Sequence, residues 1–331
     1  MHTTPSATPH LTSTTASTRL RSEHVEPRVD TIEQAWSAGA RALVLGGGGS
    51  TGNAWLIGVI AGLFDAGLDV TTADVTIGTS AGSTAAAQMA GTHPSDLLAA
   101  ILTAAPQRRT PSVGSDQGGV RTRSVTEHLE RKSKIIASAK DPADLRRKIG
   151  EAALTRDAAS DGSWQAQWRA TVAARLPSQR WPQAPVLITA VDAQTGDPVV
   201  FDRHSGVDLV DAVAASCASG LPYRIGASRF LDGGYRSNAE NADLAAGYER
   251  VLVLSPLGGR TLQPLDWGMH LAAQVDDLRA RGSRVEVIVP DSHVEHLFGA
   301  QAMDLSLRPH AARAGHVQGF ALAEQLIEFW S

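Results

Sequence analysis

The stretch V-T-I-G-T-S-A-G-S, residues 75–83, decides the fold that we expect for this chain. Residues 75–77 alternate in the manner of a short buried strand. Residues 83–90 are small and helix-prone, and Gly91 follows where a helix commonly ends. A strand, a tight turn and a helix are therefore predicted in immediate succession.

The turn between them reads G-x-S-x-G, with Ser80 flanked by Gly78 and Gly82. In a strand–turn–helix context this pattern predicts a nucleophile elbow, whose glycines allow neighbouring backbones to approach closely. The serine would lie at the positive end of a helix, where an alkoxide or oxyanion is stabilised. Taken alone, the five residues also fit an ordinary strand-to-helix turn, because glycine, serine and alanine are common.

The region before this elbow has the same strand–loop–helix order. Residues 42–45 form an apolar strand, residues 46–52 read G-G-G-G-S-T-G, and residues 53–66 have helical periodicity. The face that we expect to be buried carries Leu56, Ile60 and Leu63. A second ridge of small residues, expected to pack closely on the sheet, consists of Ala54, Gly58 and Gly62.

Strands and helices continue to alternate after residue 185. The predicted strands are 186–191, 199–202, 251–254 and 285–289, and the predicted helices are 207–216, 267–281 and 311–330. Such alternation predicts an α/β fold in which helices cover a parallel sheet.

Length and composition limit the classes of protein to consider. The 331 residues suit one large domain or two small ones, and a hydrophobic fraction of 43% can fill a sizeable core. The net charge of −4 indicates no attraction to nucleic acid. The single cysteine, Cys217, excludes an internal disulfide framework and a cysteine-rich metal site. No run of 18 apolar residues is present, so we expect a cytoplasmic protein and leave peripheral contact with a membrane open.

Two segments differ from the rest in composition. Residues 1–35 are rich in Ser, Thr and Pro, which predicts a disordered tail before a domain at residues 36–331. Residues 106–182 interrupt the α/β pattern and are predicted to form a helical insertion that caps the active site. One of its helices carries a stripe that we expect to pack against the body: Trp164, Trp168, Val172 and Leu176.

A third small motif, Asp232-Gly233-Gly234, follows the apolar pair at residues 230–231. Together the three motifs divide the tasks of acyl transfer. Ser80 would be the nucleophile, and Asp232 would orient or deprotonate it. The amides of Gly48 and Gly49 would hold the oxyanion, since glycine leaves an amide unobstructed. The glycine loop could instead bind a phosphate, and Asp-Gly is also a common turn pair.

These residues resemble the patatin-like phospholipase family, over roughly residues 40–325. Its oxyanion loop, G-G-G-x-R/K-G, corresponds to residues 47–52; its elbow corresponds to residues 78–82, and its D-G-G/A motif to residues 232–234. The resemblance implies a three-layer α/β/α sandwich with a mostly parallel sheet, acting on lipid or acyl-ester substrates without a cofactor or a metal.

The roles that the resemblance implies fall on individual residues. Ser80 and Asp232 form a catalytic dyad without histidine, and the oxyanion hole consists of Gly47, Gly48 and Gly49. Two positions depart from the family pattern: Thr51 stands where many members have Arg or Lys, and Gly46 where plant members have Asp. The missing cation bears on the charge of the preferred substrate and leaves the dyad in place.

Three alternatives compete with this interpretation. An α/β-hydrolase triad has the order Ser–Asp–His, and five histidines follow Asp232: His270, His293, His296, His310 and His316. A dinucleotide-binding protein would use G-x-G-x-x-G at residues 47–52, with Asp69 or Asp74 as the ribose-binding acid. A lipid-binding module without catalysis is the third alternative, and the intact pair of Ser80 and Asp232 argues against it.

Overall fold

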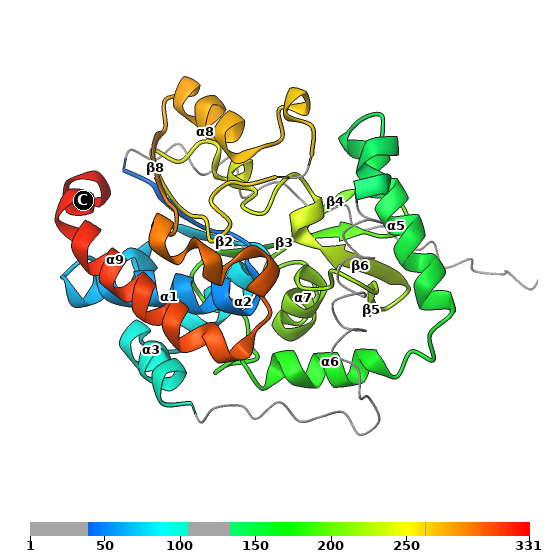
Figure 1. The fold of residues 1–331 in the computed structure, drawn as a ribbon, viewed down its shortest axis with the longest axis horizontal. Coiled ribbons are helices and arrows are strands. Elements are labelled where there is room, and N and C mark those ends of the chain that lie inside the picture. The colour runs from blue at the N-terminus through cyan, green and yellow to red at the C-terminus, as the bar shows by residue number, and fades with distance from the viewer. Residues whose placement is uncertain (1–38, 105–132, 262) are drawn as a thin grey trace, which may run out of the picture.

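The computed structural model describes residues 39–104, 133–261 and 263–331 (Figure 1). The predicted tail at residues 1–35 and the part of the predicted insertion before residue 133 lie outside these described residues. The positions of the three motifs all lie within them.

The strands of the described chain are β1 Arg41–Leu45, β2 Val75–Gly78, β3 Val186–Asp192, β4 Pro198–Phe201, β5 Tyr223–Ile225, β6 Ser228–Asp232, β7 Arg250–Leu254 and β8 Arg284–Ile288. The α-helices are α1 Gly49–Asp65, α2 Ala81–Met89, α3 Pro94–Thr103, α5 Pro142–Ala158, α6 Trp164–Ala173, α7 Leu209–Ser216, α8 Leu271–Ala280 and α9 Arg308–Trp330. Short 3₁₀ helices connect them: η1 Val70–Thr72, η2 Gly233–Tyr235, η3 Ala242–Ala245, η4 Leu265–Trp267, η5 Ser292–Leu297, η6 Gly299–Gln301 and η7 Leu305–Leu307.

All the described strands form one sheet in the order β5-β6-β3-β2-β1-β7-β8, with β4 paired to β3. The pairs from β3 through β2, β1 and β7 to β8 are parallel. Only β4, β5 and β6 pair in the antiparallel direction. The prediction of an α/β fold with a mostly parallel sheet is therefore confirmed.

Alternate residues of each strand face two different helical layers, because successive side chains of a strand point to opposite faces. Leu43 and Leu45 of β1 join the core beneath α1, α2, α3, α7 and α9, whereas Ala42 and Val44 join the core beneath α8 and η3. A third cluster lies between α5 and the far end of β3 and β6. Figure 1 shows α8 and α1 on opposite sides of the strands.

Two strands meet end to end along one edge of β3. Gly78, the last residue of β2, pairs with Ile188, and Asp232, the last residue of β6, pairs with Ala190. Because β4 pairs with both Ile188 and Ala190 on the other edge, β2 and β6 must share the remaining one. The carboxyl ends of β2 and β6 thus face each other across a short gap.

The start and packing of α1 differ from the prediction. The helix begins at Gly49 rather than at residue 53, so the end of the glycine loop is already helical. Gly58 and Gly62 contact α9 and not the sheet: a Cβ at Gly58 would collide with Ala312 O, and one at Gly62 with His316 O. The small-residue ridge was predicted to pack on the sheet, and this was wrong for Gly58 and Gly62, which pack on α9. The reason is that α1 is buried between the sheet and a second helix.

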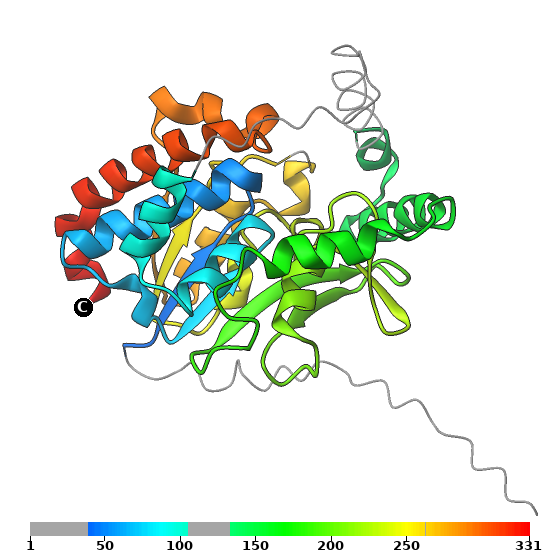
Figure 2. The ribbon, with the colours of Figure 1, turned by 90° about the horizontal axis from the view of Figure 1, so that it is seen from below.

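Other helix boundaries also differ. The predicted helix at 267–281 starts at Leu271, after the separate 3₁₀ turn η4, and α6 ends at Ala173, before Leu176. The tryptophan stripe of α6 does pack on the main core, as predicted. Figure 2 shows α9 running beside α1, with α6 crossing near α7.

Candidate active site

Ser80 lies at the tip of a strained turn between β2 and α2. Its backbone has φ 52° and ψ −110°, and among the described non-glycine residues only Asn241 also has a positive φ. Both flanking glycines are required by close contacts. A Cβ at Gly78 would lie 2.7 Å from Ser83 Cα, and one at Gly82 would collide with Leu45 O. The backbone conformation is that of a nucleophile elbow.

Asp232 faces this serine directly. Ser80 Oγ donates to Asp232 Oδ2 at 2.9 Å, and the amide of Gly234 donates to the other carboxylate oxygen, Oδ1, at 2.8 Å. The Asp232 side chain is buried, and the end-to-end arrangement of β2 and β6 brings the two residues together. Gly233 allows this approach, since a Cβ there would collide with Thr189. The two motifs, 152 residues apart in the chain, form one site.

Two residues at the end of α7 hydrogen-bond to the backbone of Ser80, and sequence reasoning missed both. Ser216 Oγ accepts from Ser80 N at 2.9 Å, and Cys217 Sγ donates to Ser80 O at 3.1 Å. Burial, and to a smaller extent the charge of Asp232, raise the pKa of Cys217 to about 11. The thiol therefore stays protonated at neutral pH, as its role of donor requires, and it is not a competing nucleophile.

The glycine loop lies on the other side of Ser80. A Cβ at Gly47 would lie 3.5 Å from Ser80 Cβ, so the loop passes directly beside Ser80. Gly49 has φ +65°, and a Cβ there would lie 2.8 Å from Ala302 O; one at Gly48 would lie 2.7 Å from Pro256 Cβ. Only glycine fits these two positions without a shift of the neighbouring residues.

The amides of the loop are not equivalent. Gly47 N donates to Ala239 O at 2.8 Å, so the expectation that Gly47 supplies an oxyanion donor does not agree with its hydrogen bond. The amides of Gly48 and Gly49 donate to no atom of the described residues. They lie at the start of α1, where the first amides of a helix lack an intrahelical acceptor. These two amides remain as candidate donors.

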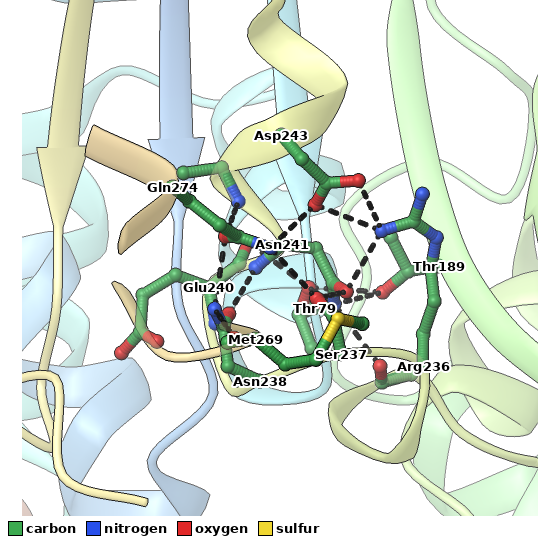
Figure 3. A network of polar contacts seen from close by, with 12 residues as sticks. Thr79, Thr189, Arg236, Ser237, Asn238, Glu240, Asn241, Asp243, Met269 and Gln274 are labelled. Atoms are coloured by element: carbon green, nitrogen blue, oxygen red, sulfur yellow. Dashed lines mark hydrogen bonds and ion pairs between the residues drawn. The ribbon is translucent and has the colours of Figure 1, made fainter. Parts of the chain in front are cut away.

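A buried polar network includes Thr79, the residue before Ser80, and connects it to Thr189 and Asn241 (Figure 3). At its centre, Asn241 Nδ2 donates to Thr79 Oγ1 and to Gly233 O, each at 3.0 Å. Thr79 Oγ1 in turn lies 2.9 Å from Thr189 Oγ1 on β3. One amide therefore connects the elbow to the aspartate turn, so the separation of Ser80 and Asp232 depends on residues that the motifs do not contain.

The histidines of the triad alternative are placed elsewhere in the described chain. His316 Nε2 lies 2.9 Å from Asp65 Oδ2, in a pair between α9 and α1. His270 precedes α8, His293 and His296 belong to η5, and His310 belongs to α9. No histidine of the described residues hydrogen-bonds to Ser80.

The acids of the dinucleotide alternative serve the backbone. Asp69 Oδ1 accepts from Thr71 N at 2.9 Å and caps η1. Asp74 Oδ2 accepts from Arg41 N at 2.7 Å, at the edge of the sheet where β2 begins. A ribose-binding acid belongs at the carboxyl ends of parallel strands, so neither residue suits that role.

Comparison with known proteins identifies the family of this chain. A model of the family described as "Patatin-like phospholipase" matches residues 43–244, which is more than half of the chain. The chain belongs to the patatin-like phospholipase family. The matched segment includes the glycine loop, the elbow and Asp232, and the family consists of lipid acyl hydrolases.

The solved structures that are similar to this chain include VipD from Legionella pneumophila, which has 14% sequence identity to it and a TM-score of 0.41. That match covers 87% of this chain and 67% of VipD. No curated protein sequence matches the chain. Among the helices that the structure describes, none is long and apolar enough to cross a bilayer.

Proposed function

We propose that this patatin-like protein is a serine hydrolase of lipid carboxylic esters, with Ser80 as nucleophile and Asp232 as base. The observation that carries the proposal is the 2.9 Å hydrogen bond from Ser80 Oγ to Asp232 Oδ2, made at a strained elbow. A hydroxyl that donates to a carboxylate has a path for its proton when the oxygen attacks a carbonyl carbon. Membership of the family supplies the substrate class, lipid acyl esters.

The reaction proceeds in two half-reactions. Ser80 Oγ attacks the ester carbonyl carbon while its proton passes to Asp232 Oδ2, and a tetrahedral oxyanion forms. The C–O bond to the alcohol then breaks, and Asp232 returns the proton to that oxygen, which leaves an acyl-serine. A water molecule, deprotonated by Asp232, attacks the acyl-serine and releases the fatty acid, and the proton returns to Ser80.

A carboxylate is a weak base for a hydroxyl, so its placement matters. Asp232 is buried, its Oδ1 is fixed by Gly234 N, and its Oδ2 therefore faces Ser80. Holding the two groups at hydrogen-bond distance lets proton transfer accompany attack, so that no free alkoxide has to form.

The amides of Gly48 and Gly49 are the oxyanion donors of this proposal. They lie at the positive end of α1 and directly follow Gly47, the residue of the loop that passes beside Ser80. Loss of one such donor typically lowers kcat by about 10²–10³-fold.

Exposed apolar residues near the loop support peripheral contact with lipid. Met303 and Leu305 are 72% and 41% exposed, and they follow Ala302, whose carbonyl accepts from Thr51 N at 3.0 Å. Large apolar side chains so close to a site for lipid esters suit contact with a lipid surface better than with water.

The function is tested with a fluorophosphonate probe and a panel of acyl esters. We expect the probe to label Ser80 alone, and Ser80→Ala to abolish labelling and to lower kcat by about 10⁴-fold or more. Asp232→Asn should lower kcat comparably while remaining folded, because its amide oxygen no longer accepts a proton. Ser95→Ala and Asp74→Asn, which alter groups of the same types away from the site, should behave as wild type.

The same panel separates the alternatives. His270, His293, His296, His310 and His316 are replaced one at a time, and every variant should keep most of its turnover. A folded histidine variant as inactive as Ser80→Ala would replace the dyad by a triad. Probe labelling that survives Ser80→Ala would remove Ser80 as the nucleophile.

A further inference from the structure

A cation from the far end of the chain lies against the first turn of α1. Arg308, the first residue of α9, donates from Nη1 to Ser50 O at 2.8 Å and to Ser50 Oγ at 3.2 Å. Its Nη2 donates to Asn53 Oδ1 at 3.1 Å. All three acceptors are neutral, and Arg308 forms no ion pair with any of the described residues. The guanidinium is held in place without a counter-charge.

This position is electrostatically unfavourable in the free protein. The amino end of a helix carries a partial positive charge, and Arg308, which is half-buried, adds a full positive charge there without an anion to pair with it. Burial and, second, the charge of Arg175 lower the pKa of Arg308 to about 10, so the group still carries its charge at neutral pH. The structure therefore keeps a half-buried positive charge, with no ion pair among the described residues, on the first turn of α1, which begins at Gly49.

The location coincides with the departure from the family motif. Thr51 occupies the position at which many members have Arg or Lys, and Arg308 binds Ser50 and Asn53 on either side of it. Thr51 itself is fully buried and its amide donates to Ala302 O. The glycine loop itself contains no cation, but Arg308 of α9 lies against the turn that follows it.

We propose that Arg308 is a positioning residue for ester hydrolysis, which fixes the first turn of α1 and adds positive potential at the oxyanion donors Gly48 and Gly49. The inference rests on the proposed function. Negative charge that develops on the carbonyl oxygen would relieve the repulsion built into the free protein, so Arg308 favours the transition state over the bound ester.

The first test uses Arg308→Gln, which keeps hydrogen-bonding capacity without charge, and Arg308→Lys, which keeps the charge. We measure kcat and KM on a short, soluble, uncharged ester, together with the inhibition constant of a trifluoromethyl ketone, which forms a tetrahedral adduct. Arg308→Gln should lower kcat by about 10–100-fold and weaken the binding of the ketone by a similar factor. Its KM should stay within about threefold of the wild-type value. Arg308→Lys should recover most of kcat. Arg313→Gln, at an exposed position of the same helix, should match wild type.

The second test separates the effect of the Arg308 charge from its effect in fixing the first turn of α1. Ser50→Asp places a carboxylate beside Arg308 at the start of α1, which should raise Tm, since an acid at a helix amino end and next to a cation is stabilising. The same change cancels the positive potential, so kcat should fall by about tenfold or more. Ser50→Asn, which adds no charge, is the matched comparison, and its kcat should fall clearly less than that of Ser50→Asp.

Two outcomes would overturn the inference. A folded Arg308→Gln variant with wild-type kcat and ketone affinity, or a Ser50→Asp variant with raised Tm and unchanged kcat, would show that Arg308 only joins two helices. Both results presuppose that wild type hydrolyses esters and that the probe labels Ser80. Absence of that activity and labelling would overturn the proposed function itself, and the inference with it.

Discussion

At the scale of single residues, Glu240 carries a buried carboxyl group next to Gly46, at the start of the glycine loop. Its Oε1 accepts from Ser255 Oγ at 2.6 Å, and its Cγ lies 3.3 Å from where a Cβ at Gly46 would be. Burial raises the pKa of Glu240 from 4.5 to about 6, against the opposing effect of the Ser255 hydrogen bond. The folded protein therefore holds a proton on Glu240 at pH values where the unfolded chain has lost it.

This difference predicts a pH-dependent stability that Glu240→Gln removes. Between about pH 4.5 and 6 the folded state binds more protons than the unfolded state, so the free energy of unfolding falls as the pH rises. At about 1.4 kcal/mol per pKa unit, the penalty above pH 6 is roughly 2 kcal/mol. Glu240→Gln keeps an acceptor for Ser255 and should be more stable than wild type by about 1–2 kcal/mol at pH 7.5, with no difference near pH 4.5.

Denaturant unfolding of wild type and variant at several pH values measures this effect. Glu324→Gln, at an exposed position of α9, is the control and should change little at any pH. A stability difference between Glu240→Gln and wild type that stayed constant from pH 4.5 to 7.5 would contradict a raised pKa for Glu240.

At the scale of elements, the orientation of α1 depends on its contact with α9, which runs beside it in Figure 2. Each helix contributes two glycines to the contact. Gly58 and Gly62 of α1 face the backbone of α9, and Gly315 and Gly319 of α9 face the backbone of α1. Since α1 begins with the candidate oxyanion donors and α9 begins with Arg308, this interface positions both.

Gly319→Ala tests the interface by the sign of its effect. Helix propensity alone favours alanine over glycine by about 1 kcal/mol. A Cβ at Gly319 would collide with Val59 O, however, so the helices must separate, and we expect a net loss of about 1–3 kcal/mol, seen as a lower Tm. Ala321→Gly, at an exposed position of the same helix, is the control and should lose about 1 kcal/mol, as propensity predicts. A rise in Tm for Gly319→Ala would contradict close backbone packing.

At the scale of the whole molecule, we propose that residues 106–182 cap the site and control the access of lipid. Within the described part, Trp168 Nε1 donates to Ala214 O at 3.0 Å, and Trp164 packs edge-on against Tyr223. The first contact joins α6 to α7, the helix that ends at Ser216 next to Ser80, and the second joins α6 to β5. The described part of the insertion thus supports the elbow.

The proposed role in access is tested outside that supporting contact. A Gly/Ser segment of equal length in place of residues 106–132 should change kcat/KM on long-chain esters by about fivefold or more and on short, soluble esters by less than about twofold. Trp168→Ala is the control, because loss of support for α7 should lower turnover on both substrates alike. An equal effect of the Gly/Ser segment on long and short esters would contradict a role in access.

Local patterns in the sequence were sufficient for many of the strands and helices, though not for all their boundaries, and for two parts of the candidate site. Strands β1 and β2, the elbow and the glycine loop are contiguous segments, in which apolar period and glycine position determine the backbone conformation. The prediction of a mostly parallel α/β sheet followed from their alternation and is confirmed. The family could be inferred because its three motifs are themselves short and ordered along the chain.

Only the tertiary structure decided which distant groups meet. The pairing of Asp232 with Ala190, next to the pairing of Gly78 with Ile188, brings the carboxylate to Ser80, and no local pattern specifies that register. No local pattern specifies three further contacts either: the packing of Gly62 on α9, the hydrogen bond from Gly47 N to Ala239 O, and the hydrogen bond from Arg308 to Ser50 O. Local sequence determines backbone conformation over a few residues, whereas these contacts depend on strand register and helix packing across the whole chain.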